Sequence, residues 1–393
     1  MLQNKQKNGH KPINILFSYE KGRGGETITI ENVLQEFNKK ENLVVERIIY
    51  PTQIHFGLIN NTLYIIKTLL IYLSNTYNKH YDWNITPTYT SILFFNLIGK
   101  IRRSKCKIAW YYQGNRLLFE SINPNQNIIR HLSQYIANKT TKYLHSIALK
   151  NVSLIIAPSK YSKRFILSKF PFSRKVKIIV AYNGVCIDKY HPLANKSKIN
   201  IKLNIAKNSK VISYIGRLDP TKGIINLINA FNLIVHANKY QNIYLIISYN
   251  RIIFQEEIVF LKIIIRLLSK YHITDKVKLI ENYSNLNDIY NISDLVILPT
   301  QADNFPLVIP EAFASGTVVI ASDIGGIKEI LEKIDERLIL LDIIPSNLVI
   351  KIDYFLNLSE PQLRKIIGKG LNVIKEHYTW KRTANTILDN LNS

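Results

Sequence analysis

The stretch of the chain that says most about the fold is residues 299–316, PTQADNFPLVIPEAFASG. It follows an apolar run that ends at Leu298, turns through a polar loop and enters a short helix. Pro310 fits the first turn of that helix, because the first amide groups of a helix have no partner within it. The stretch therefore predicts the end of a buried strand, a loop and a helix N-terminus.

Short apolar runs rich in Ile, Val and Tyr recur on both sides of this stretch, with segments of helical period between most of them. The expected strands are 13–17, 43–49, 107–112, 152–157 and 176–181 in the first half, and 211–215, 243–247, 277–280, 294–298, 317–321 and 337–341 in the second. Parallel strands need crossover helices, and these helices cover both faces of a sheet. The pattern predicts an α/β protein with two doubly wound, Rossmann-like domains.

The domain boundary is expected in residues 183–192, NGVCIDKYHP, where a turn signal and a proline follow a strand. We place the hinge near residue 190, which gives a first domain of residues 12–190 and a second of residues 191–376. The remaining residues, 377–393, are expected to form a terminal helix. Whether this helix crosses back to the first domain is left open.

The charge of the 393-residue chain is uneven. Residues 1–200 hold 30 basic and 9 acidic side chains, a net charge of +21, whereas residues 201–393 hold 22 and 19, a net charge of +3. A basic surplus is typical of proteins that bind nucleic acid or anionic membranes. The chain has no helix-turn-helix, zinc or RNP-type signature, so no nucleic-acid partner is expected.

The two cysteines, Cys106 and Cys186, lie eighty positions apart. They provide neither a disulfide framework nor a metal pair, so a reducing compartment is sufficient and no metal site is expected. The N-terminus lacks the apolar segment of a signal peptide, and no apolar run is long enough to span a bilayer. We therefore expect a cytoplasmic protein.

Two loops of the sequence carry residues suited to binding phosphate. Gly24 and Gly25 stand between the first strand and a helix, where glycine permits close approach of a ligand. The third glycine of a dinucleotide fingerprint is absent, so nicotinamide binding is disfavoured, and a plain turn remains an alternative. Arg217 and Lys222 follow the strand 211–215, where paired cations suit a diphosphate. Solvated surface charges are the alternative there.

The acidic residues of the opening stretch point to a sugar ligand. Asp303 and Glu311 stand on either side of the predicted helix N-terminus. Such a terminus can hold a phosphate, and a carboxylate can accept hydrogen bonds from vicinal hydroxyls of a sugar.

With these residues the sequence resembles the retaining glycosyltransferases of family 4, the "glycosyl transferases group 1" type of GT-B enzyme. The resemblance runs nearly from end to end, and its motifs are specific in their order rather than one by one. They are Gly24-Gly25, Pro158-Ser159, Asn183-Gly184-Val185, Gly216-Arg217-Leu218 with Lys222-Gly223, the run from Asp294 to Pro299, the acidic pair Asp303 and Glu311, Gly325-Gly326-Ile327 with Glu329, and Tyr378-Thr379-Trp380.

The resemblance implies a GT-B fold, two Rossmann-like domains that face each other across a cleft. It implies that Arg217 and Lys222 bind the donor diphosphate, Glu311 the donor ribose and Asp303 the hydroxyls of the transferred sugar, with Gly24 and Gly25 facing the donor. The implied catalytic residues are Arg217, Lys222 and Asp303. The donor site implied in full is Gly24, Gly25, Arg217, Lys222, Asp303, Asn304, Phe305, Leu307, Val308 and Glu311.

The implied reaction moves a sugar, with retention, from a nucleotide diphosphate sugar to a hydroxyl of a glycan or lipid-linked acceptor in the synthesis of cell-surface polysaccharide or lipopolysaccharide. The donor is a substrate, and no cofactor or metal is expected, because cations and a helix dipole stabilise the leaving diphosphate. A catalytically degenerate protein that binds nucleotide as a scaffold or as the partner of another transferase is the alternative. The identities of the sugar, nucleotide and acceptor are left open.

The basic first half fits an acceptor-side domain that approaches anionic lipid headgroups at the inner membrane leaflet. Residues 58–73 and 100–107 combine apolar and cationic side chains suited to such a surface. Solvated lysines on ordinary helix faces remain the alternative for each segment.

Overall fold

The computed structural model describes residues 12–20, 25–50, 58–76, 79–102, 105–114 and 147–392. The chain divides into two compact units. Unit 1 contains residues 1–181 and 383–393, and unit 2 contains residues 182–382. The domain limits expected at residues 190 and 376 stay a prediction.

Unit 1 is built on a six-stranded sheet with the order β2-β1-β3-β4-β5-β6, in which each pair of neighbouring strands is parallel. Aromatic and aliphatic side chains of strands and helices, such as Trp110, Tyr72 and Ile155, form its core. Its elements are β1 (Ile13–Glu20), α1 (Gly25–Asn38), β2 (Leu43–Tyr50), α2 (Leu58–Thr76), β3 (Trp83–Thr86), α3 (Tyr89–Arg102), β4 (Lys107–Tyr111), β5 (Leu154–Ala157), α5 (Lys160–Lys169) and β6 (Lys177–Val180).

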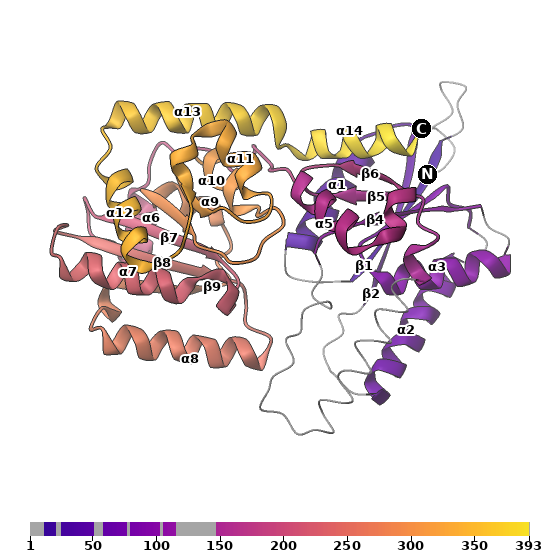
Figure 1. Ribbon diagram of the computed structural model, residues 1–393, viewed down its shortest axis with the longest axis horizontal. Coiled ribbons are helices and arrows are strands. Elements are labelled where there is room, and N and C mark those ends of the chain that lie inside the picture. The colour runs from indigo at the N-terminus through magenta and orange to yellow at the C-terminus, as the bar shows by residue number, and fades with distance from the viewer. Residues whose placement is uncertain are drawn as a thin grey trace. The chain divides into compact units, whose positions relative to one another are not determined.

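Unit 2 has a second parallel six-stranded sheet, with the order β12-β11-β10-β7-β8-β9. Helices α7 and α8 lie on one face of this sheet, and α10, α11 and α13 lie on the other (Figure 1). Its elements are α6 (Ser197–Lys202), β7 (Lys210–Gly216), α7 (Ile224–His236), β8 (Ile243–Tyr249), α8 (Gln255–Lys270), β9 (Val277–Glu281), α9 (Leu286–Ile292), β10 (Leu295–Leu298), α10 (Val308–Ala314), β11 (Val318–Ser322), α11 (Ile327–Ile334), β12 (Ile339–Leu340), α12 (Pro345–Leu356) and α13 (Glu360–His377). The last helix, α14 (Trp380–Leu391), begins in unit 2 and continues into unit 1 from residue 383.

The strand order of unit 2 reverses between β7 and β10. From β7 the chain moves outward through β8 to β9, and from β10 it moves outward in the opposite direction through β11 to β12. Ligands of doubly wound sheets bind outside the carboxyl ends of the strands at such a reversal. The loops that follow β7 and β10 are the two loops in which the sequence places Lys222 and Asp303.

The expected α/β architecture with two parallel sheets is confirmed. Each expected strand coincides with a strand of the structure, with end shifts of up to three residues. One further strand among the described residues, β3, is missing from the prediction. Its sequence, WNIT, contains two polar residues, and both are buried, with Asn84 accepting a hydrogen bond from the Ser18 hydroxyl at 2.8 Å. A buried strand with that composition does not read as an apolar run.

The last helix of the chain contributes to the core of unit 1. Residues 383–391 of α14 belong to this unit, and Ala384, Ile387 and Leu391 are buried. The indole Nε1 of Trp83 on β3 donates a hydrogen bond to the Leu391 carbonyl at 3.2 Å. The end of the chain is therefore part of the folded structure of unit 1.

We expect Ile387→Ala to lower the free energy of unfolding by about 2 to 5 kcal/mol, because it leaves a cavity at a fully buried position. The matched control is Ile28→Ala on α1, where the side chain is 45% exposed and the loss should stay within about 0.5 kcal/mol. Urea unfolding monitored by circular dichroism measures both. Equal midpoints for the two variants would contradict the packing of α14 in unit 1.

Candidate functional site

In the loop after β7, the guanidinium of Arg217 lies beside a carboxylate. Arg217 pairs with Asp219, with 3.4 Å between Nη2 and Oδ2. Asp219 in turn accepts hydrogen bonds from the backbone N–H of Thr221 at 2.9 Å and from its hydroxyl at 2.7 Å. Burial acts to raise the pKa of Asp219, but these hydrogen bonds and the charges of Arg217 and Lys222 outweigh it and keep this pKa below its usual value. The carboxylate thus stays ionised and orders the loop.

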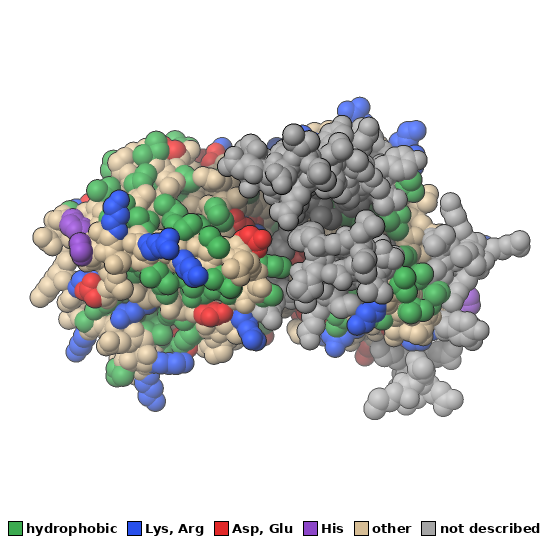
Figure 2. All heavy atoms as spheres, turned by 90° about the horizontal axis from the view of Figure 1, so that it is seen from below, with side chains coloured by type: hydrophobic (Ala, Val, Ile, Leu, Met, Phe, Trp, Pro, Cys, Tyr) green, Lys and Arg blue, Asp and Glu red, His purple; other side chains and the backbone are tan. Residues whose placement is uncertain are grey.

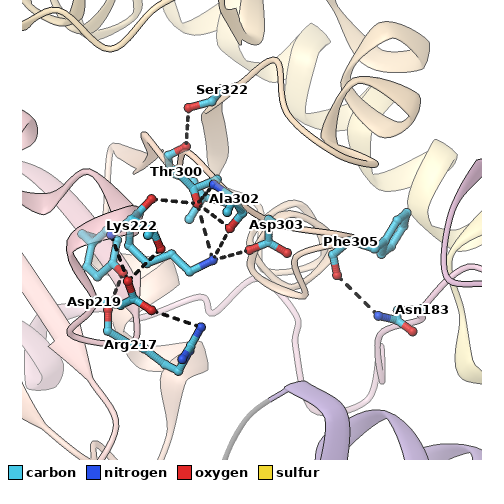
Figure 3. Close-up of polar contacts among 12 residues, drawn as sticks. Asn183, Arg217, Asp219, Lys222, Thr300, Ala302, Asp303, Phe305 and Ser322 are labelled. Carbon is cyan, nitrogen blue, oxygen red and sulfur yellow. Dashed lines mark hydrogen bonds and ion pairs between the residues drawn. The ribbon is translucent and has the colours of Figure 1, made fainter. Parts of the chain in front are cut away.

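Lys222 connects the loop after β7 to the loop after β10. Its side chain is buried and extends toward three oxygen atoms of the second loop (Figure 3). The ammonium Nζ donates to the Ala302 carbonyl and to Oδ2 of Asp303, both at 2.8 Å, and lies 3.4 Å from the Thr300 hydroxyl. The structure therefore brings together Lys222 and Asp303, which are 81 positions apart. Thr300 and Ala302 are partners that the sequence motifs did not indicate.

Two glycines press against the backbone of the second loop. Gly223 has φ +69° and Gly325 has φ +64°, a left-handed conformation that glycine adopts without strain. A Cβ at Gly223 would lie 1.9 Å from the Pro299 carbonyl oxygen, and one at Gly325 would lie 1.8 Å from that of Asp303. Both positions require glycine, so the loop is held between them.

Phe305, Leu307 and Val308 continue this loop into α10. Phe305 is buried, and its ring lies 5.5 Å from that of Tyr182 and 5.6 Å from that of Tyr378. Leu307 and Val308 are half-buried at the start of the helix. The side chain of Phe305 is thus part of the core, and only its backbone remains suited to contact with a ligand.

Asn304 contributes its carbonyl oxygen to the same region. It accepts a hydrogen bond from the N–H of Gly326 at 2.9 Å. This bond ties the loop after β10 to the turn that precedes α11.

Glu311 lies in a buried cluster of aromatic side chains. Its Oε2 accepts a hydrogen bond from the hydroxyl of Tyr290 on α9 at 2.7 Å, and the hydroxyl of Tyr190 is a second partner. Burial raises the pKa of Glu311 to about 7, although both hydrogen bonds and the charge of Lys189 oppose this rise. None of the hydrogen bonds or ion pairs of the described residues joins Glu311 to Arg217 or Lys222.

Nothing in the sequence indicates that Tyr190 and Tyr290 are partners of Glu311. Tyr290 lies in the helix before β10, and Tyr190 lies close to the expected hinge, 100 positions earlier. Their rings pack at a centroid distance of 5.8 Å, and only the fold brings them together. Neither belongs to a short motif with a recognisable spacing.

Three other motifs of the sequence meet inside unit 2. Val185 forms a parallel bridge with Thr379, and its N–H donates to the Tyr378 carbonyl at 2.9 Å. The hydroxyl of Tyr182 donates to Oε2 of Glu329 at 2.8 Å, and that of Tyr378 donates to the Glu329 carbonyl at 3.0 Å. The contacts of these motifs hold together the elements around the loop after β10. They do not place further charged groups in that loop.

The glycines expected to face the donor belong to unit 1. Gly25 is the first residue of α1 and is exposed, whereas Gly24 lies outside the described residues. In the segments 58–73 and 100–107, the side chains of 58–65 and of Lys100, Ile101 and Arg102 also lie outside the described part, as do residues 103 and 104. The roles expected for these residues stay predictions.

No helix among the described residues is both long enough and apolar enough to cross a bilayer. Among the same residues, no three His, Cys, Asp or Glu side chains gather in a way that would hold a metal ion. The expectation that the reaction needs no metal stays a prediction.

We expect Gly325→Ala to lower the free energy of unfolding by at least about 2 kcal/mol, because the new Cβ combines a left-handed φ with a backbone clash. Gly368→Ala on α13 is the matched control. A Cβ there meets nothing within 4 Å, and alanine in a helix should stabilise by about 0.5 to 1 kcal/mol. Thermal unfolding tests both, and a Gly325→Ala variant as stable as the wild type would contradict the close approach.

We expect the stability of the wild type to depend on Glu311 between pH 4.5 and 7. In this window the folded state retains a proton that unfolded Glu311 has lost, so the free energy of unfolding falls as pH rises, and it levels off above pH 7. Glutamine at this position does not titrate, so the variant is free of this pH dependence. Between pH 4.5 and 7, its free energy of unfolding should therefore rise by roughly 3 kcal/mol relative to that of the wild type. Denaturant unfolding at a series of pH values measures the difference. The exposed Glu360→Gln serves as the control, and a parallel pH profile for Glu311→Gln would count against the buried, protonated carboxyl.

Residues 195–370 match the family model described as Glycosyl transferases group 1. The chain is 26% identical over 267 residues to the lipopolysaccharide 1,2-N-acetylglucosaminetransferase of Salmonella typhimurium, covering 67% of this chain and 66% of that protein. It is 28% identical over 246 residues to the UDP-Gal:alpha-D-GlcNAc-diphosphoundecaprenol alpha-1,3-galactosyltransferase of Escherichia coli, covering 60% of each. The matched part of the chain thus spans about two thirds or less of the length of these two relatives.

The fold is similar to that of Anabaena Alr3699/HepE, solved in complex with UDP and glucose. The TM-score is 0.73 at 19% sequence identity, and the match covers 97% of this chain and 100% of the other. This likeness concerns the fold alone. Taken with the two parallel sheets, it shows that the chain has the GT-B fold, and the family match shows that residues 195–370 are similar to the glycosyl transferases of group 1.

Proposed function

We propose that the protein transfers a sugar, with retention at the anomeric carbon, from a uridine diphosphate sugar to a hydroxyl of a glycan or lipid-linked acceptor. The bond between the anomeric carbon and the diphosphate oxygen breaks, and its electron pair leaves on the diphosphate. The acceptor oxygen forms the new bond to the anomeric carbon, and its proton goes to the departing diphosphate oxygen. The names of the two relatives support this choice, since one acts on lipopolysaccharide and the other uses UDP-Gal and a diphosphoundecaprenol acceptor.

The observation that carries the proposal is the contact of 2.8 Å between Lys222 and Asp303 at the strand-order reversal. In a nucleotide sugar the transferred sugar is bonded directly to a phosphate. A cation for the phosphate and a carboxylate for the sugar hydroxyls must therefore be neighbours. Lys222 and Asp303 are neighbours of this kind, and both are fixed by loops whose backbones are tightly packed.

We assign the remaining roles in the same way. Arg217 stands on the same loop as Lys222 and supplies the second positive charge for the diphosphate, while Glu311 binds the ribose hydroxyls. Asn304, Leu307 and Val308 line the start of α10, where backbone N–H groups favour an anion. Stabilisation of the departing diphosphate by these groups replaces the charge of a metal ion in this proposal.

We also propose that the enzyme works at the cytoplasmic face of a membrane as a peripheral protein. The net charge of +21 in residues 1–200 and the lipid-linked acceptor of one relative support this location. It contributes to the synthesis of a lipopolysaccharide or a similar surface polysaccharide, as the lipopolysaccharide relative does by name.

One observation favours the alternative of a nucleotide-binding scaffold. Arg217 and Lys222 are each paired with a carboxylate, Asp219 and Asp303, so the four charges sum to zero. If the protein only binds its nucleotide, uridine diphosphate should raise its unfolding temperature, and no sugar transfer should be detected. The same assay therefore separates the two functions.

We expect Lys222→Ala to lower kcat at least about a hundredfold, the scale on which loss of one charge-stabilising group acts. The variant should also lose most of the rise in unfolding temperature that uridine diphosphate gives the wild type, because bound ligand stabilises the native state by mass action. Transfer of radiolabelled sugar and thermal shift provide the readouts. Lys365→Ala, an exposed position on α13, is the matched control and should behave as the wild type in both. Turnover of Lys222→Ala at the wild-type rate would rule out the assigned role.

A further inference from the structure

Helix α8 exposes apolar side chains that its packing does not require. Its inner face is buried through Phe260, Ile264 and Leu268. Four further apolar side chains lie outside this buried face and are 36% to 50% exposed: Ile258, Val259, Ile263 and Ile265. A surface helix usually carries one apolar stripe, with polar residues on the opposite side. The outer side of α8 departs from that rule.

A row of cations runs along the middle of this outer side. Lys262, Arg266 and Lys270 follow one another at four-residue spacing, so they stack on one line of the helix. All three are exposed, and among the described residues none of them takes part in an ion pair. Glu257 belongs to the helix start, where Oε2 accepts from the N–H groups of Ile253 and Phe254.

The helical spacing puts apolar side chains around this row. Val259 and Ile263 fall on one side of it and Ile265 on the other, while Ile258, four residues before Lys262, precedes the row on the same line. We name these four residues, together with Lys262, Arg266 and Lys270, the α8 face. Figure 2 shows the side of unit 2 on which α8 lies, with hydrophobic and basic side chains next to one another. Unpaired cations between aliphatic side chains match an anionic surface that has an apolar interior.

We propose that the α8 face docks on the surface of an anionic lipid bilayer. The row of cations meets the lipid phosphates, and the four apolar side chains around it insert between the headgroups. Both contributions to interfacial binding, apolar burial and attraction to anionic lipid, are then supplied by one helix. The choice of a bilayer rests in part on the proposed function, since a lipid-linked acceptor is met at a membrane.

A second copy of the chain does not fit this face. Two α8 helices paired about a twofold axis would place Lys262 and Arg266 of one against the same residues of the other, because these lie at the middle of the helix. Like charges brought together in this way oppose association. An acidic surface is the complementary partner, and the exposed outer side offers no Trp or Tyr, the usual anchors of protein interfaces.

The test is co-sedimentation of the full chain with vesicles of phosphatidylcholine containing one quarter phosphatidylglycerol, and with vesicles of phosphatidylcholine alone, at about 0.1 M salt. We expect Lys262→Gln/Arg266→Gln to lower partition into the anionic vesicles about thirtyfold, since each basic side chain near such a surface contributes about fivefold. Val259→Ser/Ile263→Ser should lower it at least about tenfold.

Two matched controls separate the α8 face from net charge and general hydrophobicity. Lys365→Gln/Lys369→Gln removes the same charge from α13, and Ile350→Ser removes an exposed isoleucine from α12. Both should bind vesicles within about threefold of the wild type. The thermal shift with uridine diphosphate is measured for every variant and should not change, which keeps the result independent of the proposed function.

Several outcomes would overturn the proposal. They are a wild type that does not sediment with anionic vesicles, equal sedimentation with the neutral ones, or α8 variants that bind as the wild type does. The last outcome would move the membrane contact to unit 1. Retained vesicle binding together with the loss of a dimer or of an acidic protein partner would assign the α8 face to that partner instead.

Discussion

The reversal of strand order between β7 and β10 determines where the charged groups of unit 2 can meet. Neighbouring strands usually send their loops the same way around a sheet, but these two send theirs in opposite directions. The space above their carboxyl ends is therefore left to side chains. Lys222 enters it from one loop and Asp303 from the other, and their contact at 2.8 Å joins segments 81 positions apart. Gly223 and Gly325 hold the second loop in place because no side chain fits at either position.

Most of the fold could be predicted because parallel strands are buried on both faces and read as apolar runs. Strand β10, LVIL, is of this kind, and so is β5, LIIA. The failure at β3 has the same origin. There Asn84 and Thr86 are buried as polar side chains, and the Asn84 hydrogen bond to Ser18 comes from a neighbouring strand that no local pattern reveals.

The candidate site could be predicted only where its residues follow strands. The sequence predicts Lys222 and Asp303 as site residues because loops after parallel strands gather at one edge of a sheet, and the structure brings the two together. It does not predict the tyrosines around Glu311, because Tyr190 reaches the carboxyl across more than a hundred positions. The identity of those partners decides the environment of Glu311. Burial among rings, and not the spacing of the acidic motif, gives that carboxyl its raised pKa.

The overall charge of a segment is a poor guide to what its cations do. Residues 201–393 carry a net charge of only +3. Their basic side chains nevertheless occur in two very different environments. At the carboxyl ends of the strands, Arg217 and Lys222 are paired with carboxylates and held by short loops. On α8, the cations stand in a row between aliphatic side chains, and none of them forms an ion pair with another described residue. Cations that are paired with carboxylates are held at fixed positions, which suits the binding of a small ligand. A row of exposed cations attracts anionic groups without fixing their positions, which suits binding to a broad, fluid surface. Pairing therefore separates the two kinds of basic group within one unit.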